Sequence, residues 1–183
     1  MHLQGFEGFF LSFLGRNFLS LLYRSLLEDR DGVLLVRAED RKVAGFVAGV
    51  TCQAGFYRRV LAKKALGFAW AAFGAFVRRP AIAPRLLRAL RRPAEARRGS
   101  AEAGLLSIAV RPEDQGKGIG QELVRAFGEQ LAARGVKSYC LTTDRDNNGR
   151  THRFYQKLGF RPVTEFVTPE GRAMTEYQMS LEG

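Results

Sequence analysis

The sequence predicts a mixed α/β domain of 183 residues, and three observations lead to this prediction. After residue 103, short apolar runs typical of strands alternate with amphipathic runs typical of helices, in the order β-α-β-α-β-β. Just before the first of these helices, the stretch RPEDQGKGIGQELV (111–124) has glycine at three alternate positions. Finally, the formal net charge of +11 is concentrated in one segment, 55–98.

The part of the chain before residue 55 predicts a helix followed by a β-hairpin. The run NFLSLLYRSLLEDRDG (17–32) has apolar side chains at helical spacing, and Asp31-Gly32 ends it. The runs VLLVRA (33–38) and KVAGFVAGVTC (42–52) are rich in β-formers and are joined by a polar turn.

The basic segment 55–98 predicts two helices, one around the uncharged run Ala65–Val77 and one after Pro84. This uncharged run is shorter than the ~18–20 residues that span a bilayer. Outside the segment, 17 basic and 17 acidic residues balance. Inside it, Glu95 is the single acid against twelve basic residues: Arg58, Arg59, Lys63, Lys64, Arg78, Arg79, Arg85, Arg88, Arg91, Arg92, Arg97 and Arg98.

The C-terminal half predicts the main sheet. Leu123, Phe127 and Leu131 recur at every fourth position and predict a helix that ends at Gly135. Gly159 is a predicted helix C-cap. The predicted elements are strand 103–110, the helix that ends at Gly135, strand 136–143, a helix within 147–160, and strands 160–168 and 173–182.

Cysteine and histidine are scarce, which excludes several kinds of site. Cys52 and Cys140 lie in apolar runs and predict small core residues in a reducing compartment. The sequence has only two histidines, His2 and His152, which argues against a histidine-based zinc site and against a Ser-His-Asp triad. The N-terminus lacks the pattern of a signal peptide, so we expect a cytoplasmic protein without a metal.

The glycine stretch predicts a loop that binds a phosphate group. It does not match a P-loop, because no Ser or Thr follows Lys117, nor a dinucleotide fingerprint, because Gln121 stands at its third glycine position. A glycine loop at the start of a helix still offers backbone N–H groups to an anion. The alternative is a tight turn with no ligand.

Two stretches in this order carry a resemblance to a known family. LLSIAVRPEDQGKGIGQELV (105–124), followed by NNGRTHRFYQKLGF (147–160), resembles the GCN5-related N-acetyltransferase (GNAT) superfamily. Q-G-K-G-I-G looks like its Q/R-x-x-G-x-G/A signature, and N-x6-Y-x3-GF like its next motif. The match is good from 103 to about 180 and loose over 33–52.

This resemblance implies a mostly antiparallel central sheet flanked by helices, with the basic helical insert between the third and fourth strands of the family order. The whole chain, 1–183, is then one acetyltransferase domain with an acetyl-CoA-binding core at about 103–160. Family members usually begin with a strand before the first helix, which the first residues here start too late to supply.

The resemblance further implies that acetyl-CoA is the cosubstrate. Its pyrophosphate lies on loop amides and its pantetheine arm along strand 103–110, which a bulge separates from strand 136–143. Asn148 contacts the arm in this interpretation and could also cap the following helix. The implied binding residues are Ile108, Ala109, Val110, Gln115, Gly116, Lys117, Gly118, Ile119, Gly120 and Asn148.

The chemistry implied is direct attack of an amine on the thioester, with Tyr155 protonating the departing thiolate. The alternative for Tyr155 is a core aromatic. Some family members carry a glutamate where this chain has Thr143. The candidate bases are therefore Glu102, which we take as the catalytic choice, and Asp144 or Asp146, although each also fits a surface carboxylate.

The acceptor remains open. We expect a small-molecule amine such as an amino sugar, with protein N-termini, polyamines and aminoglycosides as further options. Segment 55–98 either packs on the core, or contacts an anionic membrane or a phosphorylated acceptor; no nucleic-acid motif accompanies it. The rival to an enzyme is a non-catalytic coenzyme A-binding module, or one that docks on membrane or RNA through 55–98. A homodimer also stays open.

Overall fold

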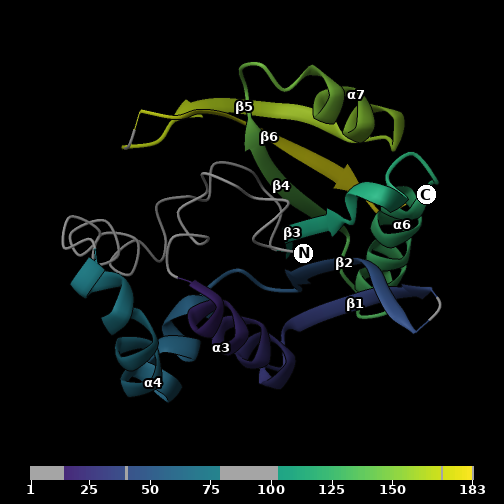
Figure 1. Ribbon diagram of the computed structural model, residues 1–183. Coiled ribbons are helices and arrows are strands. Elements are labelled where there is room, and N and C mark those ends of the chain that lie inside the picture. The colour runs from purple at the N-terminus through teal and green to yellow at the C-terminus, as the bar shows by residue number, and fades with distance from the viewer. Residues whose placement is uncertain (1–14, 40, 79–102, 170, 183) are drawn as a thin grey trace.

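The computed structural model describes residues 15–39, 41–78, 103–169 and 171–182, and these form one sheet with helices on both faces (Figure 1). In chain order the elements are α3 (Gly15–Glu28), β1 (Gly32–Glu39), β2 (Lys42–Val50), α4 (Phe56–Arg78), β3 (Ala103–Val110), the 3-10 turn η2 (Pro112–Asp114), α6 (Ile119–Ala132), β4 (Ser138–Asp144), α7 (Gly149–Lys157), β5 (Arg161–Val167) and β6 (Ala173–Ser180).

The described strands make a six-stranded sheet in the order β1-β2-β3-β4-β6-β5. Each neighbouring pair is antiparallel except β3 and β4, which are parallel. The last strand along the chain, β6, therefore lies between β4 and β5. This confirms the mixed, mostly antiparallel α/β fold and the order of elements predicted after residue 103.

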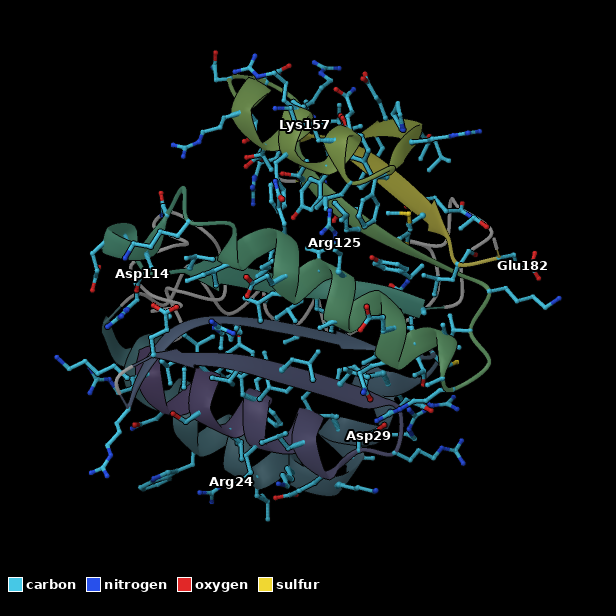
Figure 2. All side chains as sticks on the ribbon, turned by 90° about the vertical axis from the view of Figure 1, so that its right-hand side faces the viewer. Arg24, Asp29, Asp114, Arg125, Lys157 and Glu182 are labelled. Atoms are coloured by element: carbon cyan, nitrogen blue, oxygen red, sulfur yellow. The ribbon has the colours of Figure 1, made fainter. Side chains whose placement is uncertain are left out.

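Two apolar cores hold the layers together. In Figure 2, β1 and β2 lie between α6 on one side and α3 on the other. The core under α6 includes the fully buried Phe127, and the core under α3 and α4 includes the fully buried Phe56. Both helix layers thus bury one apolar face on the sheet, as their spacing predicts.

The helix predicted at 17–32 is α3, which begins earlier, at Gly15. The first helix of the basic segment is α4, and it is interrupted at Lys64, where the backbone leaves helical geometry (φ −134°, ψ 26°). The second helix, predicted after Pro84, and the N-terminal residues 1–14 lie outside the described part of the chain.

Gly49 of β2 supplies the first testable prediction, because a Cβ there would overlap the Gly104 carbonyl oxygen and the Phe127 ring. Gly49→Ala is expected to destabilise the fold by about 1–3 kcal/mol, measured by thermal or urea unfolding. Gly149→Ala is the control, since its Cβ would meet Arg153 Nη1 at an ordinary 3.7 Å. Equal losses in both variants would contradict this packing.

Candidate active site

The candidate site lies where β3 and β4 separate. Ala103 pairs with Tyr139 and Gly104 with Cys140, and these are the two residue pairs that join the strands. Beyond them β3 and β4 diverge, as Figure 1 shows. The inner edge of β3 is therefore open to a ligand along most of its length.

A β-bulge accompanies this separation. In the pairing of β2 with β3, Ala48 faces Ser107 and Gly49 faces Leu105. Leu106 is the extra residue between them, and its side chain is exposed. A bulge bends its strand and increases the local twist, which turns the following residues of β3 away from β4. The bulge that the family resemblance implied is present.

Between the two strands lies a cavity of about 900 Å³. One wall is β3, the floor is the start of α6, and the other wall is the end of β4 with α7. All the predicted cofactor-binding residues except Lys117 line it. The lining includes Ile108, Ala109, Val110, Gln115, Gly116, Gly118, Ile119, Gly120, Thr142, Thr143, Asp144, Asn148, Arg150, Phe154, Tyr155 and Arg172.

The glycine loop presents backbone N–H groups to this cavity. Gly116 and Gly118 have φ angles of +83° and +86°, which only glycine adopts readily, and Gly118 is the N-cap of α6. Within the described part of the chain, no hydrogen-bond acceptor is met by the backbone N–H groups from Gly116 to Gly120. They lie at the positive end of the helix dipole, so together they can bind an anion.

Asp114 holds this loop in shape. Its buried carboxylate accepts hydrogen bonds from Arg111 Nε and Lys117 Nζ, both at 2.7 Å. These bonds, that from Lys117 first, lower the pKa of Asp114, while Asp114 raises the pKa of Lys117. The Lys117 ammonium is thus directed at Asp114, so its predicted contribution to the site comes through the backbone and the loop.

Asn148 joins the end of β4 to the start of α7. Its Nδ2 donates to Thr143 Oγ1 at 2.7 Å and to the Asp144 carbonyl oxygen at 3.0 Å. The side chain makes no capping bond to α7, although Asn148 is the N-cap residue. The capping role proposed for its side chain is therefore wrong, and the amide is oriented from the β4 side, along the cavity wall.

Tyr155 is largely buried in the cavity wall, on the face of α7 that packs on the sheet. Its ring lies edge-on to Phe160, with centroids 5.4 Å apart. Burial raises the pKa of Tyr155 to about 12, so the phenol is neutral at physiological pH. No described residue hydrogen-bonds its hydroxyl. The ring of Tyr155 therefore packs as a core aromatic. This packing is compatible with the predicted proton donor, because no described residue occupies the hydroxyl.

The three candidate bases differ in position. Glu102 lies outside the described residues. Asp146 is exposed, is absent from the cavity lining, and is paired with Arg145 at 2.9 Å. Asp144 lines the cavity, but both of its oxygens accept hydrogen bonds from Arg172 Nη2, at 2.6 and 2.7 Å.

Arg172 is a site residue that sequence reasoning missed. It comes from the turn between β5 and β6 and reaches the cavity from a position 28 residues beyond Asp144. An isolated arginine after a turn carries no local signal. Its position follows from the antiparallel register that places Met174 of β6 opposite Asp144.

Two further findings concern metals and membranes. Among the described residues, no group of three or more His, Cys, Asp and Glu side chains could hold a metal ion. None of the helices in the described ranges is long and apolar enough to cross a membrane.

The shape of the site defines a class of protein. An anion-binding helix start at one end, an open strand edge beside it and a neutral phenol further along suit an extended acyl thioester of coenzyme A. The site is therefore that of an α/β acyltransferase. Sequence comparison agrees: the model of the Acetyltransferase (GNAT) family matches residues 6–160, and the chain belongs to this family. It is an N-acetyltransferase with acetyl-CoA as cosubstrate.

Solved structures support the fold. The chain is similar to the ribosomal-protein-S18-alanine N-acetyltransferase from Escherichia coli (16% identity, 88% of this chain and 76% of that chain, TM-score 0.53). It is also similar to Ard1 from Thermoplasma volcanium (18%, 88% and 76%, TM-score 0.52) and to an aminoglycoside 6'-N-acetyltransferase complexed with coenzyme A (12%, 85% and 76%, TM-score 0.52). Curated proteins contain no significant sequence match.

The loop geometry leads to a second prediction, on acetyl-CoA binding. Gly118→Val forces a β-branched residue into a positive φ and places its side chain in the cavity. We expect acetyl-CoA to bind at least roughly a hundredfold more weakly, because several hydrogen bonds to a charged group are lost. Calorimetric titration measures this loss of affinity.

The matched control is Gly135→Val, after α6, where φ is +76° and a Cβ likewise meets nothing within 4 Å. It carries the same backbone strain away from the cavity. Comparable thermal destabilisation with unchanged acetyl-CoA affinity is expected for it. If both variants lost binding equally, strain and not the loop's role in binding would be the cause.

Proposed function

We propose that this chain transfers the acetyl group of acetyl-CoA to the primary amine of a small molecule, such as an amino sugar, by direct attack in a ternary complex. The observation that carries the proposal is that one cavity contains both the free N–H groups of the glycine loop and the Tyr155 side chain. Donor binding and chemistry can then occur in one connected space.

The residues suited to hold acetyl-CoA form three groups. The N–H groups of Gln115 to Gly120 would bind the pyrophosphate, with glycine allowing close approach. The backbone of β3 at Ile108, Ala109 and Val110 would pair with the pantetheine amides as an added strand does. Gln115 Nε2 already lies 3.4 Å from the Val110 carbonyl oxygen. Asn148, fixed by Thr143, would contact the arm from the opposite wall.

The reaction needs two proton movements. The amine nitrogen attacks the thioester carbonyl carbon, a C–N bond forms, and the C–S bond then breaks to release a thiolate. Tyr155 donates its proton toward that sulfur. A phenol of pKa about 12 is a weak acid for a thiol in water, but the same burial also raises the proton affinity of the thiolate. The hydroxyl therefore stabilises charge where it develops.

The amine must lose its own proton before it attacks, because an ordinary amine has a pKa of about 10. Among the candidates, Glu102 remains our choice of base. It directly precedes Ala103, the first residue of β3, in the sequence. The bidentate pair with Arg172 argues against Asp144, and exposure outside the cavity argues against Asp146.

The similar structures and the cavity both bear on the identity of the acetyl acceptor. The similar structures include an N-acetyltransferase of a ribosomal-protein alanine and one of aminoglycosides, so both protein and small-molecule amines occur as acceptors among them. The cavity volume suits a small acceptor in addition to the reactive end of acetyl-CoA. We take residues 1–183 as one domain, with segment 55–98 contacting an anionic membrane or a phosphorylated acceptor.

The test is Tyr155→Phe, assayed with acetyl-CoA against a panel of amino sugars, polyamines and peptides. We expect kcat to fall by about a hundredfold or more, while the calorimetric affinity for acetyl-CoA stays the same because the ring is kept.

Wild-type kcat should not fall with increasing pH up to at least pH 10, since a phenol of pKa about 12 remains protonated.

Tyr177→Phe is the matched control. Its hydroxyl donates to His152 Nδ1 at 2.8 Å, because His152 Nε2 is committed as the donor to the Arg145 carbonyl oxygen at 2.9 Å. The Tyr177→Phe variant removes a phenol hydroxyl from the same aromatic cluster, but at a residue that does not line the cavity. Its kcat should stay within a few-fold of the wild-type value. An unchanged rate in Tyr155→Phe would remove Tyr155 as the acid. Acetyl-CoA binding without turnover of any amine would favour the non-catalytic module.

A further inference from the structure

Two adjacent helices expose large apolar side chains on their solvent side. Leu66 and Trp70 lie one turn apart on α4 and are 88% and 82% exposed, and Leu27 of α3 is 63% exposed. The opposite side of these helices is buried, with Phe18 of α3 packed edge-on to Phe68 of α4 at 5.0 Å. The exposed leucines and tryptophan therefore lie on the faces of α3 and α4 that point away from the core. Clustered exposure of this kind marks an interaction surface.

Cations stand among these apolar groups. Glu28 of α3 accepts a hydrogen bond from Lys64 Nζ of α4 at 2.5 Å, and this bond, with the nearby charges of Arg24 and Lys63, lowers the pKa of Glu28. Arg24 and Lys63 therefore lie close to this link between the helices. Both are exposed, and neither forms an ion pair with a described residue.

The acids of this region are already neutralised. Glu28 is paired with Lys64. Asp29 and Asp31 are both paired with Arg59. The charge left over on this surface is consequently positive. Along α3, Arg24 and Leu27 are three apart, and on α4, after its interruption at Lys64, Leu66 and Trp70 are four apart, so the members of each pair share a helix face. Lys63 lies just before the interruption, near Glu28 of α3.

We propose that the α3–α4 outer face, defined as Arg24, Leu27, Lys63, Leu66 and Trp70, binds the surface of an anionic lipid bilayer. Leucine and tryptophan enter the boundary between headgroups and acyl chains, and Arg24 and Lys63 meet anionic headgroups. A nucleic acid would use the same cations but would leave the two leucines exposed to water, so a bilayer fits the composition better.

The surrounding sequence and the shape agree with this occupant. Segment 55–98 contains twelve basic residues against Glu95, so more positive charge follows α4 along the chain. Figure 2 places Arg24 at the end of the molecule opposite Lys157 of α7. A protein bound through the α3–α4 outer face would thus keep α7, which carries Tyr155, on the side away from the bilayer.

The inference selects the membrane from the two partners that the proposed function leaves open for segment 55–98. It does not need acetyl transfer, because vesicle binding is measured without substrates. A chain that binds vesicles but turns over no amine would refute the proposed function alone, and a chain that acetylates amines but ignores vesicles would refute this inference alone.

The experiment uses the full chain with large vesicles of phosphatidylcholine alone or mixed with phosphatidylglycerol. Trp70 is the single tryptophan of the sequence, so its fluorescence reports on this surface only. We expect co-sedimentation with the anionic vesicles and a shift of the emission to shorter wavelength. Both should weaken strongly at about 0.5 M salt, where surface charges are screened. Binding to neutral vesicles of equal strength would overturn the role of charge.

The variant pair separates this surface from the overall charge. Arg24→Glu with Lys63→Glu is expected to weaken binding to anionic vesicles by at least roughly tenfold. Lys157→Glu with Arg161→Glu changes the net charge by the same amount at exposed positions on and after α7 and should bind within about twofold of wild type, the range of a small surface effect. Equal losses in the two double variants would overturn the proposal.

Leu66→Ser tests the apolar part, and it keeps Trp70 as the probe. The variant should weaken binding to anionic vesicles several-fold and reduce the emission shift, because one leucine side chain no longer enters the bilayer. Acetyl-CoA affinity, measured for each variant, confirms that the fold is retained. Vesicle binding with no emission shift at Trp70, or tighter binding to single-stranded RNA than to anionic vesicles, would also overturn the proposal.

Discussion

The whole active site depends on how early the pairing between β3 and β4 ends. Each strand remains bonded along its other edge, β3 to β2 as far as Val110 and β4 to β6 throughout, so the opening leaves backbone groups unpaired on one edge only. Such groups are costly to bury without partners, and a ligand that supplies partners is favoured there. Gln53 closes the narrow end, where its Nε2 donates to the Ala103 carbonyl oxygen at 3.1 Å and contacts Cys140 Sγ at 3.2 Å.

Next to this opening, an aromatic core fixes the positions of the cavity walls relative to one another. Tyr139 of β4 is buried and packs edge-on against Phe127 of α6 and against Phe160 after α7, with centroids 5.5 and 5.2 Å apart. Tyr155 packs on Phe160 in turn. Because close-packed side chains resist small displacements, this core sets the separation between the α6 start and the Tyr155 hydroxyl before any ligand binds. Packing and site geometry are therefore one property of the fold.

Features encoded by neighbouring residues could be predicted from the sequence, and features encoded by register could not. The bounds of β3, 103–110, follow from a local pattern, and the structure confirms them. The predicted glycine loop before the helix is also present, and the structure adds that Gly116 and Gly118 have positive φ angles. The pair between Asp144 and Arg172 joins residues 28 apart and requires the β4–β6 alignment, which no local pattern encodes. The interruption of α4 at Lys64 was missed for the same reason: the residues around it favour a continuous helix, while Lys64 bonds Glu28 on another helix.

The charged groups beside the cavity are largely paired with one another, and this pairing bears on the two proton movements of the proposed reaction. Asp114 is held by Arg111 and Lys117, where it shapes the loop and leaves the backbone N–H groups to carry the anion. Asp144 is held by Arg172. Tyr155, by contrast, is neutral and buried, so it can give a proton but cannot take one. The proposed acid, Tyr155, is thus part of the packed core, and the proposed base would be a group outside the ion pairs described for these ranges. The packed core fixes the proposed acetyl-CoA site, whereas the proposed base is not part of the described core. The residues that bind the amine acceptor can therefore vary in such an enzyme without disturbing the fold.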